Sequence, residues 1–261
     1  MLKLIEGGFS SGAHAALLDL IKKSVEDKKE CFLFVPEQQT LSAEAEMCAI
    51  LPSYAPRFFE VTNFTRFANT TFRKLGGIGG KYCTGAESSL IMWRVLTELK
   101  DRLTMCAGRR ALAPGMVERA LSAVHELQNH GVSVEKLLSV IASDSIKDAR
   151  LRTKLTDLHL IYSSYKTYVS EKYNDLADDA AELAQKLEEK PEFLKDTHIY
   201  IDGFISFTKP QRELIKVMMM CTDVTVTLTI PRASRRSFEY TEVRETEKCS
   251  KTSPAKRQMS K

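Results

Sequence analysis

A loop near the start of the chain has the glycine spacing of a phosphate-cradling loop, G-x-x-x-x-G. In active NTPases the backbone amides of this loop hold the phosphates, a following Lys reaches them, and a Ser or Thr then binds Mg²⁺. Ala13 and His14 stand in those two places here. The helix N-terminus can still attract an anion, but the point charge and the metal ligand are replaced. The expected residues of this degenerate loop are Gly7, Ser10, Ser11 and Gly12.

A second position that matters for nucleotide chemistry is changed in the same way. An active NTPase of this kind ends a later strand with an Asp-Glu pair, in which Asp holds Mg²⁺ and Glu handles the attacking water. The apolar run 198–202 ends in Asp202, but Gly203 follows it. These two independent replacements predict that the chain does not hydrolyse ATP by itself. We find no Ser/His/Asp or Cys/His arrangement for nucleophilic catalysis.

The elements that position these residues alternate between strands and helices. Short apolar runs predict strands at 2–6, 31–35, 58–61, 198–202 and 224–230. Helical periodicity predicts helices at 13–26, 37–50, 64–75 and 210–221. Such regular β-α units predict an α/β fold with a parallel sheet and crossover helices. With the glycine loop after the first of these strands, we expect a P-loop type of sheet.

The middle of the chain has helical stripes and no strand pattern. Helices are expected at 90–103, 116–130, 134–142, 151–173 and 178–189. We therefore expect a helical insertion, 86–196, between a first α/β part, 1–85, and a resumed part, 197–230. The remaining residues, 231–261, have few apolar side chains, which predicts a disordered tail.

Charge and cysteine content narrow the class of protein. The net charge of +4 is concentrated in 231–261, where nine Lys and Arg face four Glu, so the rest of the chain is near neutral. This distribution does not require a nucleic acid partner, and we interpret the basic tail as solvated. The six cysteines form no C-x-x-C pair, and no apolar run reaches the length of a membrane span. We expect reduced thiols in a cytoplasmic protein without membrane contact.

Two motif-like segments are interpreted as structural. His125 and His130 resemble the zinc motif H-E-x-x-H, but the second His comes one residue late and turns about 100° off the face of the first. The segment 76–81, GGIGGK, resembles a phosphate loop but follows a helix, so we expect a connector. No metal site is predicted.

Three segments arrive in an order that resembles a known family. They are Val35–Thr40 (VPEQQT), Val61–Ala68 (VTNFTRFA) and Ile199–Phe204 (IYIDGF), with Phe207, Thr208 and Gln211 after them. Together with the first loop, they resemble the N-terminal part of the B subunit of the AddAB (RexAB) helicase–nuclease, over roughly residues 1–230.

The resemblance implies a subunit that acts in the resection of double-strand DNA breaks for recombinational repair. Its B subunit resembles a superfamily 1 helicase with a decayed motor, reads the Chi sequence on single-stranded DNA, and works with an A subunit that supplies the ATP-driven motor. The family's nuclease domain and 4Fe-4S cluster have no counterpart here; a truncated or frameshifted gene product, or a deliberately shortened chain, would explain this. No cofactor is expected in this chain itself, although the family uses Mg²⁺ and ATP.

The resemblance also implies DNA-binding residues in the loops after the second, third and fourth strands. These are Gln38, Thr40, Phe64, Arg66, and Phe204 with Phe207. Amides and hydroxyls can bond bases or phosphates, aromatic rings can stack on bases, and Arg can do both. The alternative is that Phe64 and Phe204 belong to the core and Gln38 caps a helix. Asn69 departs from the family, which tends to have Trp there. Two other functions stay open: a residual ATP-binding domain and a non-functional fragment.

Overall fold

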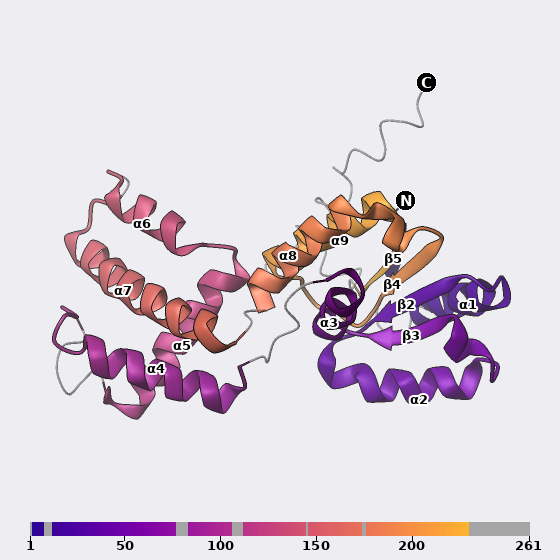
Figure 1. Ribbon diagram of the computed structural model, residues 1–261, viewed down its shortest axis with the longest axis horizontal. Helices are drawn as coiled ribbons and strands as arrows, with labels where there is room; N and C mark the ends of the chain where they lie inside the picture. The colour runs from indigo at the N-terminus through magenta and orange to yellow at the C-terminus, as the bar shows by residue number, and fades with distance from the viewer. Residues whose placement is uncertain are drawn as a thin grey trace, which may run out of the picture. The chain divides into compact units, whose positions relative to one another are not determined.

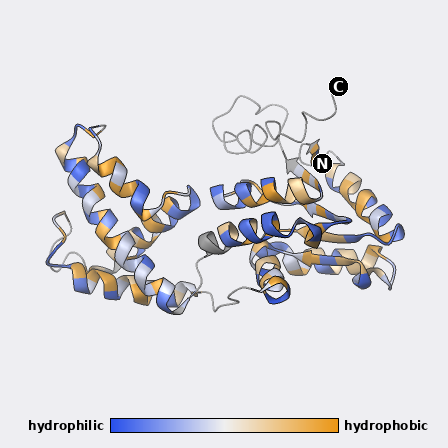
Figure 2. Cartoon of the chain, turned by 45° about the horizontal axis from the view of Figure 1, so that its top comes forward, coloured by the Kyte–Doolittle hydropathy of each residue, from blue (hydrophilic) through white to orange (hydrophobic). Residues whose placement is uncertain are grey.

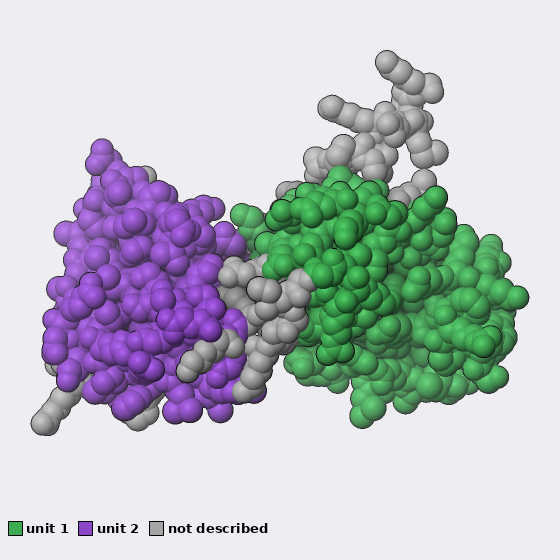
Figure 3. All heavy atoms as spheres, viewed as in Figure 1, with its two compact units in different colours: residues 1–77, 180–261 green, residues 78–179 purple. Residues whose placement is uncertain are grey.

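The computed structural model describes residues 2–7, 12–76, 83–105, 112–144, 146–173 and 176–229. The chain forms two compact units, which we describe separately (Figure 3). Unit 1 comprises residues 1–77 and 180–261, and unit 2 comprises residues 78–179. Ser10, Ser11 and the expected tail 231–261 lie outside the described residues.

Unit 1 is built on a five-stranded sheet in which every pair of neighbouring strands is parallel. Its strands are β1 (Leu2–Gly7), β2 (Glu30–Phe34), β3 (Phe59–Thr62), β4 (Thr197–Ile201) and β5 (Asp223–Thr229). Their order across the sheet is β1-β5-β4-β2-β3. The predicted α/β class with a parallel sheet is confirmed, and the strand ends lie within about one residue of the expected ones.

Helices cover both faces of this sheet (Figure 1). One face carries α1 (Ala13–Glu26) and α2 (Thr40–Ile50), whose side chains pack with Leu33 and Tyr200. The other face carries α3 (Phe64–Leu75), α8 (Leu176–Glu189) and α9 (Lys209–Cys221). Short 3-10 turns lie between these elements: η1 (Glu37–Gln39), η2 (Ala55–Arg57) and η4 (Pro191–Leu194). Apolar residues concentrate in the strands and along the helix sides that face them (Figure 2).

Side-chain caps fix where two of these helices begin. The Asn63 side chain accepts a hydrogen bond from the backbone N–H of Arg66, at 2.8 Å, and so begins α3 directly after β3. Thr208 and Gln211 form a reciprocal capping box at the start of α9. The Asn63 cap makes the connection from β3 to α3 a single residue, which holds Phe64 and Arg66 near the carboxyl edge of the sheet.

Unit 2 consists of helices that are contiguous in the chain. They are α4 (Gly85–Leu99), α5 (Pro114–Asn129), α6 (Val134–Ala142) and α7 (Ala149–Lys172). Buried residues such as Met92, Leu96, Val124, Tyr162 and Tyr165 form its own core. The expected helix 90–103 instead spans Gly85–Leu99, because Thr84 and Glu87 form a capping box before Gly85.

Helix α8 marks where the helical segment returns to the sheet. Its Leu183 and Leu187 are fully buried in the core cluster of unit 1, with Phe72 and Ile199. The second half of α8 therefore belongs to the sheet unit, although the sequence places it within the helical insertion 86–196. Among the described residues, no helix is long and apolar enough to cross a membrane.

Candidate functional site

The candidate site lies at the carboxyl edge of the sheet in unit 1. The connection after β2 runs along one face through α2, whereas the connection after β4 runs along the other face through α9. Neighbouring strands whose connections diverge in this way leave a crevice outside their carboxyl ends, and ligands of open α/β sheets bind there. The loops that begin at Val35 and Asp202 flank this switch point.

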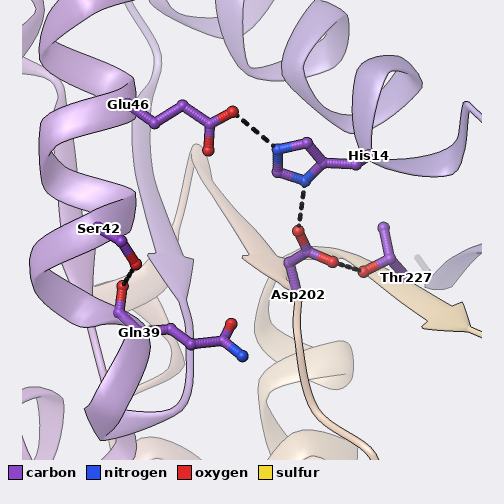
Figure 4. A network of polar contacts seen from close by, with 6 residues as sticks. All are labelled: His14, Gln39, Ser42, Glu46, Asp202 and Thr227. Atoms are coloured by element: carbon purple, nitrogen blue, oxygen red, sulfur yellow. Dashed lines mark hydrogen bonds and ion pairs between the residues drawn. The ribbon is translucent and has the colours of Figure 1, made fainter. Parts of the chain in front are cut away.

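An imidazole ring joins two carboxylates beside this crevice (Figure 4). His14 Nδ1 lies 2.8 Å from Asp202 Oδ2, and His14 Nε2 lies 3.0 Å from Glu46 Oε1. The Thr227 hydroxyl donates a hydrogen bond to the other oxygen of Asp202. The network thus joins α1, α2, the end of β4 and β5.

The charge of His14 follows from these neighbours. Burial of the ring lowers its pKa, but the hydrogen bonds to Glu46 and Asp202 and the charges of both carboxylates outweigh burial, so the pKa of His14 is raised above 6.5. In its protonated form, the imidazole can donate one N–H to each carboxylate. Figure 4 shows the ring lying between Glu46 and Asp202.

These residues do not fit Mg²⁺-ATP. Gly12 lies just before α1 with φ of +78°, and Ala13 begins the helix in place of a Lys. His14 supplies nitrogen where a hydroxyl ligand is required, and both oxygens of Asp202 already accept hydrogen bonds, from His14 and Thr227. Among the described residues, no three His, Cys, Asp or Glu side chains gather to hold a metal ion. We derive no step through a nucleotide.

The loops after β2 and β4 approach each other closely at the crevice. Gly203 has φ of +76°, and a β-carbon added to it would lie 2.3 Å from Oε1 of Gln39 and 3.3 Å from Cδ of Pro36. The positive φ favours glycine at this point of the loop, and any other residue would also have to displace the end of the Gln39 side chain. Gln39 lies against the loop of Asp202. Gln38 is exposed in η1, and Thr40 is half-buried with its hydroxyl 3.5 Å from the Pro36 carbonyl oxygen.

Aromatic rings gather on the other side of the same edge. The ring centroid of Phe64 lies 5.1 Å from that of Phe34, 5.5 Å from that of Phe204 and 6.4 Å from that of Phe207. Phe64 and Phe204 are half-buried, whereas Phe207 is 4% exposed. Phe64 and Phe204 thus pack against the core cluster of unit 1 without being fully buried, while Phe207 lies within that cluster.

Arg66 stands in the first turn of α3, two residues after Phe64. Its side chain is 51% exposed, and Nη1 lies 2.9 Å from Oε1 of Glu44 on α2. An exposed ion pair of this kind contributes little to stability. The guanidinium can therefore exchange its partner for a phosphate at low cost. Asn69 is half-buried one turn further along α3.

The residues of the two motif-like segments that the structure describes lie within a helix or directly after one. His125 lies within α5, and His130 follows its last residue. Gly76 follows α3 with φ of +80°, and the rest of the segment expected as a connector, 77–81, lies outside the described residues.

Comparison with known proteins decides the family. Residues 4–252 match the family described as "ADDB, N-terminal". The chain belongs to the AddB N-terminal family. This confirms the resemblance carried by the segments VPEQQT, VTNFTRFA and IYIDGF, all of which lie at the carboxyl edge of the sheet.

Similar proteins in several bacteria are each named as the B subunit of an ATP-dependent helicase/deoxyribonuclease. The protein of Caldanaerobacter subterraneus subsp. tengcongensis is 30% identical over 232 residues, covering 88% of this chain and 20% of that protein. The protein of Ruminiclostridium cellulolyticum is 30% identical over 237 residues, which cover 85% of this chain and 20% of that protein. The protein of Thermoanaerobacter sp. strain X514 is 28% identical over 245 residues, which cover 93% of this chain and 21% of that protein. The chain thus spans about a fifth of the length of these AddB-type relatives.

Three residues of this AddB-family site are not found by sequence reasoning. Glu46 and Thr227 complete the network around His14 and Asp202, and Gln39 fills the space beside Gly203. Nothing in the local sequence pattern around Glu46 points to His14. The alternating sequence of β5 could have pointed to Thr227. Its side chain lies on the same face of the strand as that of Thr225, because side chains two residues apart share a face.

Proposed function

We propose that this chain is the inactivated-helicase-like N-terminal region of an AddB-type subunit and that the carboxyl edge of its sheet binds single-stranded DNA without hydrolysing ATP. The observation that carries the proposal is the gathering of polar and aromatic side chains from three loops at one edge. Gln38 and Thr40 follow β2, Phe64 and Arg66 follow β3, and Phe204 follows β4.

The chemistry of these side chains suits a single strand. The rings of the half-buried Phe64 and Phe204 offer surfaces for base stacking, which contributes about 1–3 kcal/mol per base. Arg66 can bond a phosphate or a base edge once it leaves Glu44. The amide of Gln38 is exposed and can select among bases by hydrogen bonding.

The polar network supports a silent nucleotide site. In the proposed P-loop ancestor, Mg²⁺ would lie between the residue at position 14 and Asp202. A direct 2.8 Å contact between His14 and Asp202 replaces that arrangement. We propose that the region serves as a DNA-reading scaffold and that a partner A subunit supplies the ATP-driven motor.

We also propose the biological process, the compartment and the partner with which this region acts. The relatives are named as B subunits of an ATP-dependent helicase/deoxyribonuclease, and this name supports a role in the resection of double-strand breaks and in recombinational repair. We propose that the single strand carries the recognition sequence Chi, that the subunit acts in the cytoplasm as a heterodimer with an AddA-type protein, and that this part of it holds no cofactor.

The test is a titration of fluorescein-labelled single-stranded DNA into the full chain at several salt concentrations, with and without ATP and Mg²⁺. We expect salt-sensitive binding that ATP does not change. Arg66→Ala should weaken binding about tenfold and reduce the salt slope by about 1. Phe64→Ala should remove a stacking surface, so the double variant should bind more weakly still.

Matched variants separate a DNA contact from a general loss of charge. Arg73→Ala removes an exposed cation in the last turn of the same helix and should change binding less than twofold. Glu44→Gln frees Arg66 and should tighten binding. Unchanged binding by the Arg66/Phe64 double variant would overturn the site, and a thermal shift on addition of ATP would overturn the silent nucleotide site.

A further inference from the structure

A cavity lies between α2 and the segment that leads to β3, away from the crevice at Asp202. Its volume is about 200 Å³. The α2 side of its wall is a stripe of Met47, Cys48 and Leu51, and the sheet side is Phe59 and Val61. A cavity of about 150 Å³ with such apolar walls accommodates benzene. The space therefore suits one Phe or Leu side chain, and Cys48 in the wall is exposed, so solvent reaches it.

The sheet side of the cavity wall is part of β3, which is an edge strand of the sheet. Among the described residues, β3 pairs with β2 alone. The backbone oxygens of Phe58 and Thr62 accept hydrogen bonds from the N–H groups of Cys31, at 2.7 Å, and Val35, at 3.0 Å. Because backbone groups alternate in direction along a strand, those of Phe59 and Val61 point away from β2.

The cavity and the open edge therefore share two residues. Phe59 and Val61 direct their side chains into the cavity and their backbone groups toward the outer edge. Figure 1 shows α2 running alongside β3 at this end of the sheet. An added strand would place every second side chain on the cavity's face, which is the arrangement by which sheet edges bind extended peptides.

We propose that β3 is a docking edge for an extended protein segment, which adds a strand to the sheet and inserts one apolar side chain into the cavity. The segment would alternate apolar and basic residues. Glu60 is exposed on the opposite face of β3 from the cavity, where the neighbouring side chains of the segment would lie. Opposite charges across such a pair are favourable.

The charges at this edge select against nucleic acid. Glu60 carries no cation partner in a described ion pair, and Glu44 in the cavity wall contributes a second carboxylate, paired with Arg66. Two acids beside an apolar cavity repel phosphates, while an open row of N–H and C=O groups matches a polypeptide backbone. This surface meets the proposed DNA edge at the Glu44–Arg66 pair. The peptide readouts use Cys48 and Glu60 and do not involve Arg66, so either proposal can fail without the other.

The probe is a fluorescein-labelled, end-blocked pentapeptide, Lys-Phe-Lys-Val-Lys, titrated into the full chain. Two further versions carry N-methyl groups on either the apolar residues or the Lys residues. Only one set of amides faces the edge of β3, so one methylated peptide should lose binding at least tenfold while the other binds normally. Alkylation of Cys48 by iodoacetamide, followed by mass spectrometry, should slow about fivefold at saturating peptide.

Two pairs of variants place the peptide on this edge. Cys48→Phe fills the cavity and should weaken binding at least tenfold, whereas Ala49→Phe, exposed at the next position of α2, should leave it unchanged. Glu60→Lys should reverse the preference from the Lys peptide to Glu-Phe-Glu-Val-Glu, and this readout stands if Cys48→Phe fails to fold. Equal binding of both methylated peptides would overturn the proposal. So would dimerisation of the chain through this edge, or equal Cys48 protection by toluene alone.

Discussion

The two compact units use polar side chains in different ways. In unit 1, polar side chains from distant segments meet at the carboxyl edge of the sheet, where His14, Glu46 and Asp202 remain partly exposed. In unit 2, Ser88 and Asp157 are buried polar residues, and Asp157 accepts hydrogen bonds from the backbone N–H groups of Thr104 and Met105. Unit 1 therefore presents chemistry at a surface, whereas unit 2 uses polar chemistry to hold a turn.

This difference explains where the candidate residues lie. Every candidate residue predicted from the sequence falls within the residue ranges of unit 1. A parallel sheet brings loop residues together at one edge whatever their separation in the chain, and a run of consecutive helices has no such common edge. The comparison predicts that changes in unit 1 affect ligand binding and that changes in unit 2 affect its own stability.

The largest effect is expected from the core of the sheet unit. Leu183→Ala on α8 removes a fully buried side chain that packs with the sheet, and it should lower the free energy of unfolding of unit 1 by about 2–5 kcal/mol. Hydrogen exchange should accelerate in β2 and β4 and stay unchanged in α4–α7. The control is Glu188→Ala, an exposed position on the same helix. Equal acceleration in both units would show that they unfold as one.

The next effect is expected in unit 2. Asp157→Ala leaves the N–H groups of Thr104 and Met105 without their acceptor and should lower the stability of this unit by about 1–3 kcal/mol. Thermal unfolding followed by hydrogen exchange should locate the loss in α4–α7. Asp101→Ala, an exposed carboxylate near the same turn, should change stability by less than about 0.5 kcal/mol. An equal loss with Asp101→Ala would contradict the assigned role.

Much of the fold follows from local sequence, because local rules determine its elements. The helix 13–26 and the helix 64–75 are found with the expected bounds, since strand-to-helix loops and caps begin them sharply. The end of α4 at Leu99 and the attachment of α8 to the sheet are not found, because they depend on tertiary packing. The parallel sheet itself is predicted from the alternation of strands and helices.

The candidate site is predictable only in part. Asp202 is expected because it ends an apolar strand, and His14 because it stands in a recognisable loop frame. Their partners, Glu46 and Thr227, are separated from them by 32 and 25 residues. Local pattern carries no information on such pairs. They are found only once the order of the strands is known.

A smaller effect is expected at the crevice between β2 and β4. Gly203→Ala places a side chain at φ of +76° and moves Gln39, so we expect a loss of about 1–2 kcal/mol in the stability of unit 1. Combining it with Gln39→Ala should recover the part due to crowding but not the part due to φ. Chemical unfolding of the two single variants and the double variant measures both parts. An additive result would show that Gln39 and Gly203 do not interact.

The smallest expected effect is a pH dependence of the stability of unit 1. It distinguishes the contribution of the His14 network at the surface from that of the buried sheet. The pKa of His14 is raised in the folded protein, so its ion pairs stabilise unit 1 fully below pH 6.5 and are lost as pH rises through the higher folded pKa. His14→Gln should therefore lower stability by at most about 1 kcal/mol near pH 6, because the side chain is largely exposed, and the deficit should shrink toward pH 8 or above.

His198, in β4 of the same sheet, should change the pH dependence of stability in the opposite direction. Burial lowers the pKa of His198, so its neutral form stabilises unit 1 above pH 6.5 and that contribution is lost as pH falls through the lower folded pKa. The deficit caused by His198→Gln should thus grow from acid toward neutral pH, while that of His14→Gln shrinks from neutral toward alkaline pH. Urea unfolding of both variants between pH 5 and pH 9 measures the two slopes. Slopes of the same sign would contradict the pairing of His14 with Glu46 and Asp202.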